Sequence, residues 1–269
     1  MQGLLRELPI HHSLARVFSD LGTPLFWRSL VDTLRLLLPL DNALVALMAP
    51  GHPPQGLEDF EFNPAADSEQ LADYFSGMYL LDPFYLAASN GMADGLYRLE
   101  GLAPDQFRQS EYYLSYFSRV VGQDEVQFIV NLDAGVVLGL SLGSHSTWRS
   151  EQFGLLLTVR DWVLAAMRKH LSLVQWEVPA AARGGSDFAA TFGQFAARLS
   201  ERESVTARLI LQGFSSKAIA KQLGISPETV KVHRRNLYHK LGVTTHAELF
   251  ALFLQQGGEP GAAGSLNPV

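Results

Sequence analysis

Apolar residues recur every three or four positions along several stretches of the chain, which predicts helices packed on a core. Elsewhere they form short runs or alternate with small residues, which predicts strands. Helices are predicted over residues 4–20, 24–38, 67–90, 104–120 and 150–174, with a break near Pro83 because proline disfavours helix at the residue before it. Strands are predicted over residues 42–48, 124–132 and 136–143.

The clearest strand signal is a hairpin. Residues 124–132 and 136–143 flank Asp133-Ala134-Gly135, a good turn sequence. The second strand places large apolar residues on one face and small residues on the other: Val136, Leu138, Leu140 and Leu142 against Gly139, Ser141 and Gly143. Helices before and after an antiparallel sheet predict an α+β fold, here a three-layer α/β/α domain over residues 1–176.

The C-terminal part carries four helix signals in close succession. Ser200 and Glu203 form a capping box, and Gly213 ends the helix that it starts. A short second helix covers residues 217–223, Gly224 turns the chain, and Ser226-Pro227 begins a third helix that reaches Leu241. Thr245 and Glu248 cap a fourth helix. Two short helices joined by a glycine turn predict a helix-turn-helix within residues 188–256.

The third of these helices has a buried side and an exposed side. At about 100° per residue, Val230, Leu237 and Leu241 share one face, while Lys231 and Arg235 point away from it. Long cations can bond guanine edges in the major groove, and Val232 can contact a thymine methyl. Thr229 and Lys217 are placed to meet phosphates.

The distribution of charge along the chain supports a separate DNA-binding segment. The net charge of the chain is −6, but residues 196–256 hold nine Lys/Arg and four Asp/Glu, leaving 12 and 23 for the remainder. A basic segment joined to an acidic one predicts a DNA-binding module fused to a module with another task. The chain has no cysteine, which fits a cytoplasmic protein.

The C-terminal segment resembles the LuxR-type helix-turn-helix family. The resemblance rests on residues 217–226, on Thr229-Val230-Lys231-Val232-His233 and on Lys240-Leu241-Gly242-Val243. It implies a transcription regulator in which Lys231, Val232 and Arg235 read the groove and the fourth helix helps two subunits to pair. The predicted DNA-contacting residues are Lys217, Thr229, Lys231, Val232, Arg234 and Arg235.

The N-terminal domain does not match two common switch modules. A phosphorylated receiver needs a lysine after a late strand, whereas Lys169, the only lysine before Lys217, falls in a predicted helix. A nucleotide switch needs a phosphate loop, and the sequence has none. The segment resembles instead a GAF/PAS-like ligand domain of quorum-sensing regulators, through Tyr79-Leu80-Leu81-Asp82-Pro83. The aromatic residues expected upstream are Glu69 and Asp73 here, which departs from the autoinducer pattern.

Aromatic residues are dense between positions 74 and 117, and Asp82 lies among them. Aromatic walls and a carboxylate suit a ligand that carries an amine or another donor. Two simpler interpretations stay open: the aromatic residues form ordinary core, and Asp82 caps a turn before Pro83. The predicted ligand-binding residues are Tyr79, Asp82, Tyr85 and Tyr97.

These patterns predict a regulator with double-stranded DNA, a small-molecule signal and a second copy of the chain as partners, and with RNA polymerase as a further candidate. The alternative is an N-terminal domain that serves only dimerisation or protein interaction. Residues 177–187 are rich in Pro, Gly and Ala and predict a linker, and residues 257–269 a disordered tail. No catalytic constellation, metal spacing or cofactor motif appears, so no enzyme activity, metal or cofactor is predicted, and no segment predicts a membrane span.

Overall fold

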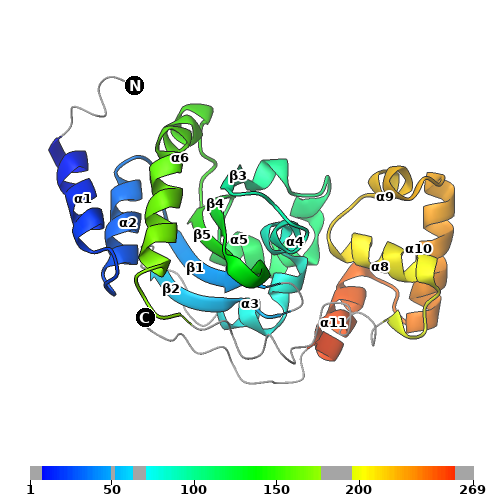
Figure 1. Ribbon diagram of the computed structural model, residues 1–269. Helices are drawn as coiled ribbons and strands as arrows, with labels where there is room; N and C mark the ends of the chain where they lie inside the picture. Colours follow the sequence, from blue (N-terminus) through cyan, green and yellow to red (C-terminus); the bar gives the residue numbers. More distant parts are fainter. Residues whose placement is uncertain (1–7, 50–51, 63–70, 177–195, 258–269) are drawn as a thin grey trace.

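The computed structural model describes residues 8–49, 52–62, 71–176 and 196–257. The predicted linker over 177–187 and all but the first residue of the predicted tail over 257–269 lie outside the described residues. Figure 1 shows a layered part with a central sheet and, beside it, a bundle of four helices. Across the described ranges, no helix is both long enough and apolar enough to cross a membrane.

A five-stranded antiparallel sheet lies at the centre of the N-terminal part, with strand order β2-β1-β5-β4-β3. Its strands are β1 (Asn42–Met48), β2 (Gln55–Glu61), β3 (Gly95–Arg98), β4 (Asp124–Asn131) and β5 (Val137–Ser144). The predicted hairpin joins β4 to β5 through a turn over Asp133–Gly135, where Gly135 takes a φ of +74°.

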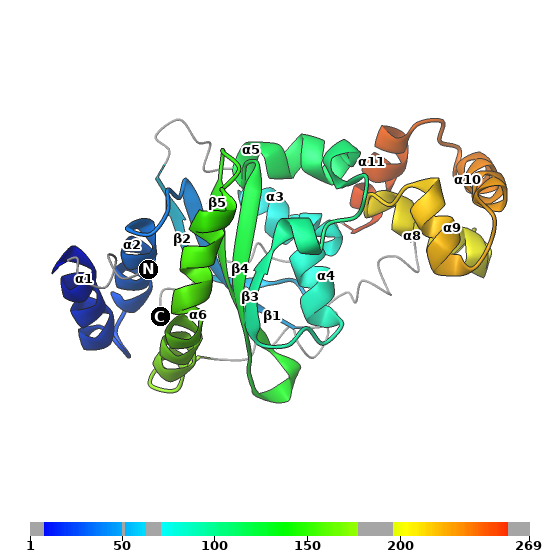
Figure 2. The same ribbon diagram turned by 90° about the horizontal axis from the view of Figure 1, so that it is seen from above.

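One face of the sheet is covered by α2 (Phe26–Arg35) and α6 (Ser150–Leu171), and α1 (Leu8–Ser19) packs on the outer side of α2 (Figure 2). Leu138, Leu140 and Leu142 of β5, all fully buried, belong to the core on this side. The predicted sorting of β5 into a large apolar face and a small face is therefore confirmed.

The opposite face carries a layer of short helices: α3 (Leu71–Ser76), η3 (Met78–Leu81), α4 (Pro83–Ser89), η4 (Leu99–Gly101), η5 (Phe107–Gln109), a π-helical turn η6 (Tyr113–Phe117) and α5 (Ser118–Val120). The sequence predicted two longer helices here, and the break that it predicted near Pro83 in the first of them is confirmed. The first is interrupted twice, at Gly77 and at Asp82, and Pro83 opens α4 because a proline at the first position loses no helical hydrogen bond. With these layers the predicted three-layer α+β fold is confirmed.

Two strands escaped the sequence analysis, and both are edge strands. β2 reads Gln-Gly-Leu-Glu-Asp-Phe-Glu, and its charges are tolerated because the outer edge of the sheet is solvated. β3 has only four residues, too few for an alternation to be recognised. Both strands owe their structure to the neighbour with which they pair.

The four-helix bundle consists of α8 (Glu201–Leu211), α9 (Ser216–Leu223), α10 (Pro227–Leu241) and α11 (His246–Gly257). The predicted caps are present: Ser200 Oγ accepts from Glu203 N at 3.4 Å, and Thr245 Oγ1 accepts from Glu248 N at 3.1 Å. Gly224 and Gly242 take left-handed φ angles of +66° and +71°, which end α9 and α10.

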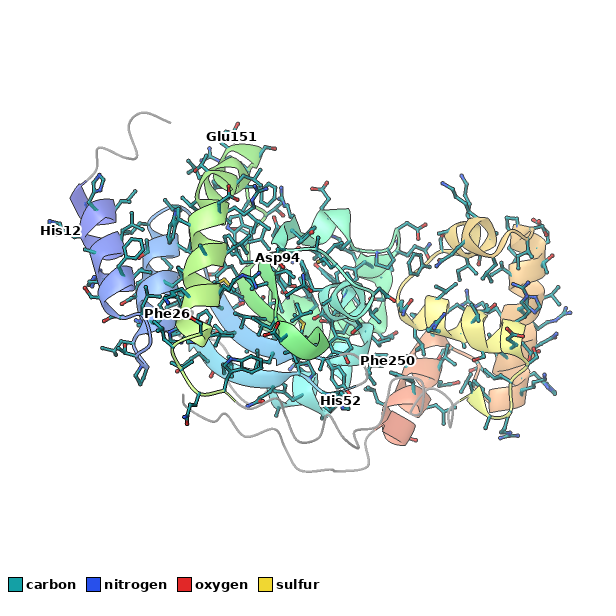
Figure 3. The ribbon with its side chains drawn as sticks, in the orientation of Figure 1. His12, Phe26, His52, Asp94, Glu151 and Phe250 are labelled. Atoms are coloured by element: carbon teal, nitrogen blue, oxygen red, sulfur yellow. The ribbon has the colours of Figure 1, made fainter. Side chains whose placement is uncertain are left out.

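The bundle contacts the layered part at the turn between α8 and α9. Gln106 N donates to Gly213 O at 3.0 Å, and Ser215 N donates to Asp105 Oδ1 at 2.9 Å. Phe250 of α11 is buried and lies where this helix meets the N-terminal part (Figure 3). One hydrophobic cluster runs from the short helices of the N-terminal part into the bundle, so the two parts share a packed interface.

Candidate functional site

Helix α10 has the two-sided character that the sequence predicted. Val230 and Leu237 are fully buried against the bundle, whereas Lys231 and Arg235 are exposed. Val232 is 43% exposed, which is unusual for an apolar side chain and places it on the same free surface. Both views of the ribbon put α10 at the end of the bundle away from the sheet (Figure 1, Figure 2).

The start of α10 is held firmly. Ser226 Oγ accepts from Thr229 N at 3.1 Å and lies 3.0 Å from Thr229 Oγ1. Thr229 is exposed at this end, and Lys217 is exposed on α9. Because the first turn of a helix leaves free N–H groups, this end is also suited to a phosphate.

The cations of α10 differ in their surroundings. Lys240 pairs with Glu203 Oε2 at 2.6 Å, a bond that ties the end of α10 to α8. The guanidinium of Arg234 lies 5.2 Å from the ring centre of Tyr238. Within the described part of the chain, Lys231 and Arg235 form no ion pair, so their side chains are available to another molecule.

A second candidate site lies in the N-terminal part, in a cavity of about 90 Å³ between the sheet and the short helices. Strands β1, β2, β4 and β5 form its floor, and α3 and η6 form much of its roof. Ser141, one of the small residues on this face of β5, lines the cavity, whereas at Gly139 the space is taken by Met48, whose Cε would lie 2.8 Å from an added Cβ. The buried polar residues that line the cavity are Tyr74, Asp82, Tyr112, Tyr116, Glu125, Gln127 and Ser141.

Glu125 is the centre of the polar floor. Its Oε1 accepts from Ser141 Oγ at 2.5 Å and from Gln127 Nε2 at 2.9 Å. Burial raises the pKa of Glu125 to about 8, and the charge of Asp82 adds to the rise. Gln127 is 5% exposed, and its Oε1 has no hydrogen-bond partner among the residues that the structure describes.

Asp82 serves two purposes in the structure. Its Oδ1 accepts from Phe84 N at 2.8 Å and so caps α4, and its Oδ2 accepts from Tyr74 Oη at 2.7 Å at the cavity wall. Burial raises the pKa of Asp82 to about 6, although these hydrogen bonds counteract part of the rise. The turn-capping interpretation is therefore confirmed, and the carboxyl group also lines the cavity.

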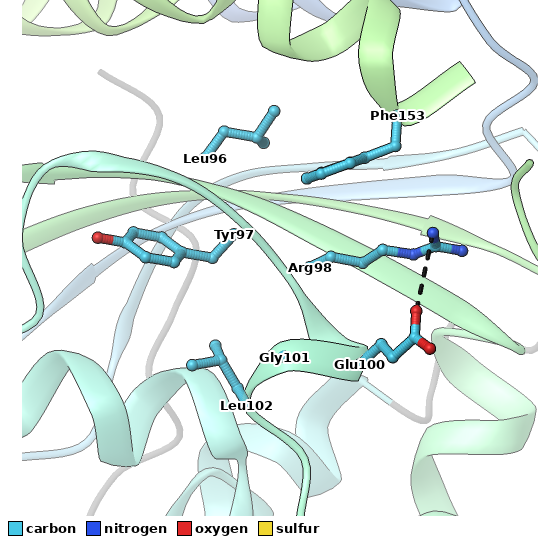
Figure 4. Close-up of a pocket in the computed structure, with 7 residues that line it drawn as sticks. All are labelled: Leu96, Tyr97, Arg98, Glu100, Gly101, Leu102 and Phe153. Carbon is cyan, nitrogen blue, oxygen red and sulfur yellow. Dashed lines mark ion pairs between the residues drawn. The ribbon is translucent and has the colours of Figure 1, made fainter. Parts of the chain in front are cut away.

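The four predicted ligand residues do not meet at one site. Of the four, only Asp82 is among the residues that line the cavity. Tyr79 packs edge-on to Tyr85, with ring centres 4.9 Å apart, and Tyr85 Oη donates to His52 O at 2.8 Å. Tyr97 lies on β3 in a separate open groove beside Arg98 and Phe153 (Figure 4), and its hydroxyl donates to Ala93 O at 3.0 Å.

The sequence analysis missed the polar floor. Glu125 and Gln127 alternate with Val126 and Phe128 along β4, which places two polar side chains on one face of a buried strand. This alternation was the available signal, because a buried polar residue needs a partner or a purpose. Tyr112 and Tyr116 belong to the aromatic segment that the sequence analysis noted, but only the tertiary fold places them in the roof of the cavity.

Known proteins match both parts of the chain. Residues 197–253 match the family model described as "Bacterial regulatory proteins, luxR family". A protein of Aeromonas salmonicida described as an HTH-type transcriptional regulator in the exeN 3' region is 34% identical over 189 residues, which covers 64% of this chain and 93% of that protein. The transcriptional regulatory protein UhpA of Escherichia coli is 51% identical over 51 residues, and the chain spans 26% of its length.

A solved structure matches the N-terminal part. The VqsR LBD domain of Pseudomonas aeruginosa is 36% identical, with a TM-score of 0.57, over 62% of this chain and 99% of that one. The luxR-family model thus covers the four-helix bundle, and the Aeromonas protein and the VqsR LBD domain extend the likeness into the layered part.

Proposed function

Since this chain belongs to the luxR family of bacterial regulatory proteins, we propose that it binds operator DNA as a homodimer under the control of a small molecule in the N-terminal cavity. DNA-binding regulation of transcription is the activity of the family. The exposed row of Lys231, Val232 and Arg235 on the free side of α10 carries the proposal.

In the proposed complex α10 enters the major groove. Lys231 and Arg235, one helical turn apart, reach guanine edges, and Val232 contacts a thymine methyl between them. Lys217, Thr229 and Arg234 meet the phosphates on either side and set the position of the helix. The buried residues Val230 and Leu237 fix the rotation of α10 about its axis, so the cations keep pointing outward.

The test replaces Lys231 and Arg235 singly with alanine. The operator is selected from a random duplex pool with the wild-type protein, and affinity is measured by fluorescence anisotropy. A good base contact contributes about 1–3 kcal/mol of discrimination, so each variant is expected to bind the selected duplex roughly 10- to 100-fold more weakly.

The matched control is Lys169→Ala, which removes an exposed cation from α6 in the N-terminal part. It is expected to leave operator affinity within about twofold. Circular dichroism should show the same helix content in all variants, because neither α10 cation is buried. Unchanged operator affinity in both α10 variants would contradict this mode of docking.

The cavity supports the second half of the proposal. It lies between the sheet and a layer of short helices, and several polar groups converge on it, as in small-molecule sites generally. The likeness to the VqsR LBD domain extends over this same part of the chain. A binding site for a small molecule is therefore the use that best explains the space and its lining.

One segment links the cavity to the DNA-binding bundle. Tyr112 and Tyr116 line the cavity, and Phe107 and Ser110, a few residues earlier, lie against Gly213 of the bundle. Ser110 Oγ accepts from Tyr113 N at 3.2 Å and so joins the two ends of this segment. We propose that a ligand which moves the two tyrosines also moves this contact and changes which arrangement of the bundle is populated.

A further inference from the structure

We infer that the cavity binds a small organic cation, an ammonium group on a short aliphatic body, between Glu125, Asp82 and the tyrosine roof. This inference rests on the proposed small-molecule control and names its ligand class. It is argued from the charges, the unpaired polar atom and the rings that line the cavity.

The charges of the lining all have one sign. Apart from tyrosines, the ionisable residues that line the cavity are the buried Asp82 and Glu125 and the exposed Asp59 and Glu61, and the lining includes no Lys, Arg or His. A buried carboxylate is costly unless it is paired. The cavity therefore has a deficit of positive charge that a bound cation removes.

The neighbouring acid Asp124, by contrast, is already paired with a cation. Asp124, the other carboxyl group whose charge acts on Glu125, is bound by Arg98 at 2.5 Å and by Trp148 N at 3.0 Å. Arg98 forms this pair with Asp124 and does not line the cavity, so it does not neutralise Glu125 or Asp82. With pKa values of about 8 for Glu125 and about 6 for Asp82, the pair without a cation holds close to one negative charge at neutral pH, most of it on Asp82, and a cation bound beside Glu125 favours ionisation of the second carboxyl group.

Hydrogen bonding indicates a donor ligand too. Ser141 already donates to Glu125, and the amide of Gln127 donates to the same oxygen. The polar atom of the cavity floor that lacks a hydrogen-bond partner within the described residues is an acceptor, the buried Gln127 Oε1. An ammonium group brings three donors and no acceptor, which is the complement of this lining.

The roof adds aromatic faces. The rings of Tyr74 and Tyr116 are stacked with centres 5.8 Å apart, and Tyr112 lies 5.6 Å from Tyr116. Ring faces attract cations, and the attraction grows when the cation leaves water. The volume of about 90 Å³ is well below the 300–1,000 Å³ of typical drug-sized sites, so the present shape admits a short ligand and not a long acyl chain.

The experiment compares matched probes on the full chain. n-Butylamine and cyclohexylamine are titrated against n-butanol and cyclohexanol, which keep the body and replace the ammonium group by a hydroxyl. Thermal shift and isothermal titration calorimetry give the readout. Both amines are expected to bind at least tenfold more tightly than their alcohols and to raise the melting temperature, because they bind only the folded protein.

Glu125→Gln is the variant that tests the site, since the amide keeps the shape and accepts the same hydrogen bonds. It is expected to weaken amine binding at least tenfold and to leave alcohol binding unchanged. Glu100→Gln is the matched control, because it makes the same change on an exposed side chain in the open groove of Figure 4. Tyr116→Phe, which keeps the ring, should retain most of the amine affinity.

Calorimetry in buffers of different ionisation enthalpy adds a second readout. A bound cation favours the ionised form of Glu125, so amine binding at pH 7 should release a proton in the wild type and none from this site in Glu125→Gln. The inference is overturned if the alcohols bind as tightly as the amines, if Glu125→Gln binds amines unchanged, or if the wild type binds no amine.

N-Butanoyl homoserine lactone, a neutral probe with a short acyl chain, separates the inference of a cationic ligand from the proposed small-molecule control on which it rests. If the lactone raises the melting temperature and the amines do not, the inference of a cationic ligand is overturned and the proposed small-molecule control stands. If neither class of probe binds, the inference of a cationic ligand is overturned and the proposed small-molecule control loses its support as well. DNA binding through α10 is measured independently and does not depend on this outcome.

Discussion

Glu125 shows how one buried residue couples the fold to its site. The carboxyl group sits in the middle of a sheet, where burial raises its pKa to about 8. It accepts hydrogen bonds from Gln127 and Ser141, and the described residues that line the cavity include no cationic side chain. A residue whose burial costs stability and whose atoms face a cavity is a strong candidate for binding.

The pH dependence of stability should reveal this cost. Between the ordinary pKa of about 4.5 and the folded value of about 8, the folded state binds a proton that the unfolded state does not. The free energy of unfolding therefore falls as pH rises through this window, by up to about 1.4 kcal/mol per pH unit for this group. Glu125→Gln removes this contribution, so the variant should gain stability relative to the wild type from pH 5 to pH 8.

Urea denaturation at four pH values measures this difference. Asp82, with a pKa of about 6, faces Glu125 and acts in the same direction, while Tyr74, Tyr112 and Tyr116 have pKa values raised further above their ordinary range by burial. His170, whose pKa burial lowers to about 4, acts in the opposite direction in both proteins. Parallel curves for wild type and variant would show that Glu125 is not protonated in the folded state.

Among the elements, the segment from Asp105 to Phe117 contacts both the DNA-binding bundle and the cavity. Its first part contacts the DNA-binding bundle, where hydrogen bonds from Ser215 overcome the effect of burial and lower the pKa of Asp105. Its second part, η6, is wound as a π-helical turn and carries Tyr116 into the cavity roof. π-Turns are frequent at functional sites because they re-aim side chains.

Gly213→Ala tests the contact between the two parts. Gly213 has a φ of +92°, and a Cβ there would lie 3.2 Å from Phe107 Cα and 3.3 Å from Ser110 Cβ. The variant should lose about 1–2 kcal/mol from backbone strain and, in addition, loosen the contact. Hydrogen exchange of the amides of Gln106 and Ser215 should become at least tenfold faster, because both donate across this interface.

Gly242→Ala is the matched control. Its φ is +71°, and a Cβ there meets nothing within 4 Å, so the variant carries similar strain without a contact between the parts. Exchange at Gln106 and Ser215 is expected to stay near the wild-type rate. Equal acceleration in both variants would mean that strain inside the bundle, and not the contact, controls this interface.

The whole molecule separates its charges. Residues 196–256 hold nine Lys/Arg against four Asp/Glu, whereas the rest of the chain holds 12 against 23, so a duplex is attracted by one part and repelled by the other. This separation favours approach of DNA to the free side of α10, which both views place away from the sheet (Figure 1, Figure 2).

Half-site spacing tests the proposed dimer. Two-fold pairing of the chain predicts a selected operator with two half-sites about 10–10.5 base pairs apart, centre to centre. Inserting five base pairs turns one half-site to the opposite side of the duplex and should weaken binding at least tenfold. Inserting ten restores the face and should weaken it less. Equal affinity for all three duplexes would indicate that single subunits bind.

The sequence by itself determined the helices of the bundle, the hairpin of β4 and β5 and the outward cations of α10. These features depend on local signals: capping serines, glycines with left-handed φ, and periodicities that a single element carries. The family resemblance, confirmed by the comparisons, rests on the same local residues.

The tertiary structure alone decided the edge strands, the additional helix break at Gly77 and the lining of the cavity. β2 and β3 exist because a neighbouring strand satisfies their backbone groups. Glu125, Gln127, Ser141 and Tyr116 come from three separate elements and meet only when the sheet closes under η6. Periodicity reports which face of an element is buried, whereas a binding site depends on what that face meets across the fold.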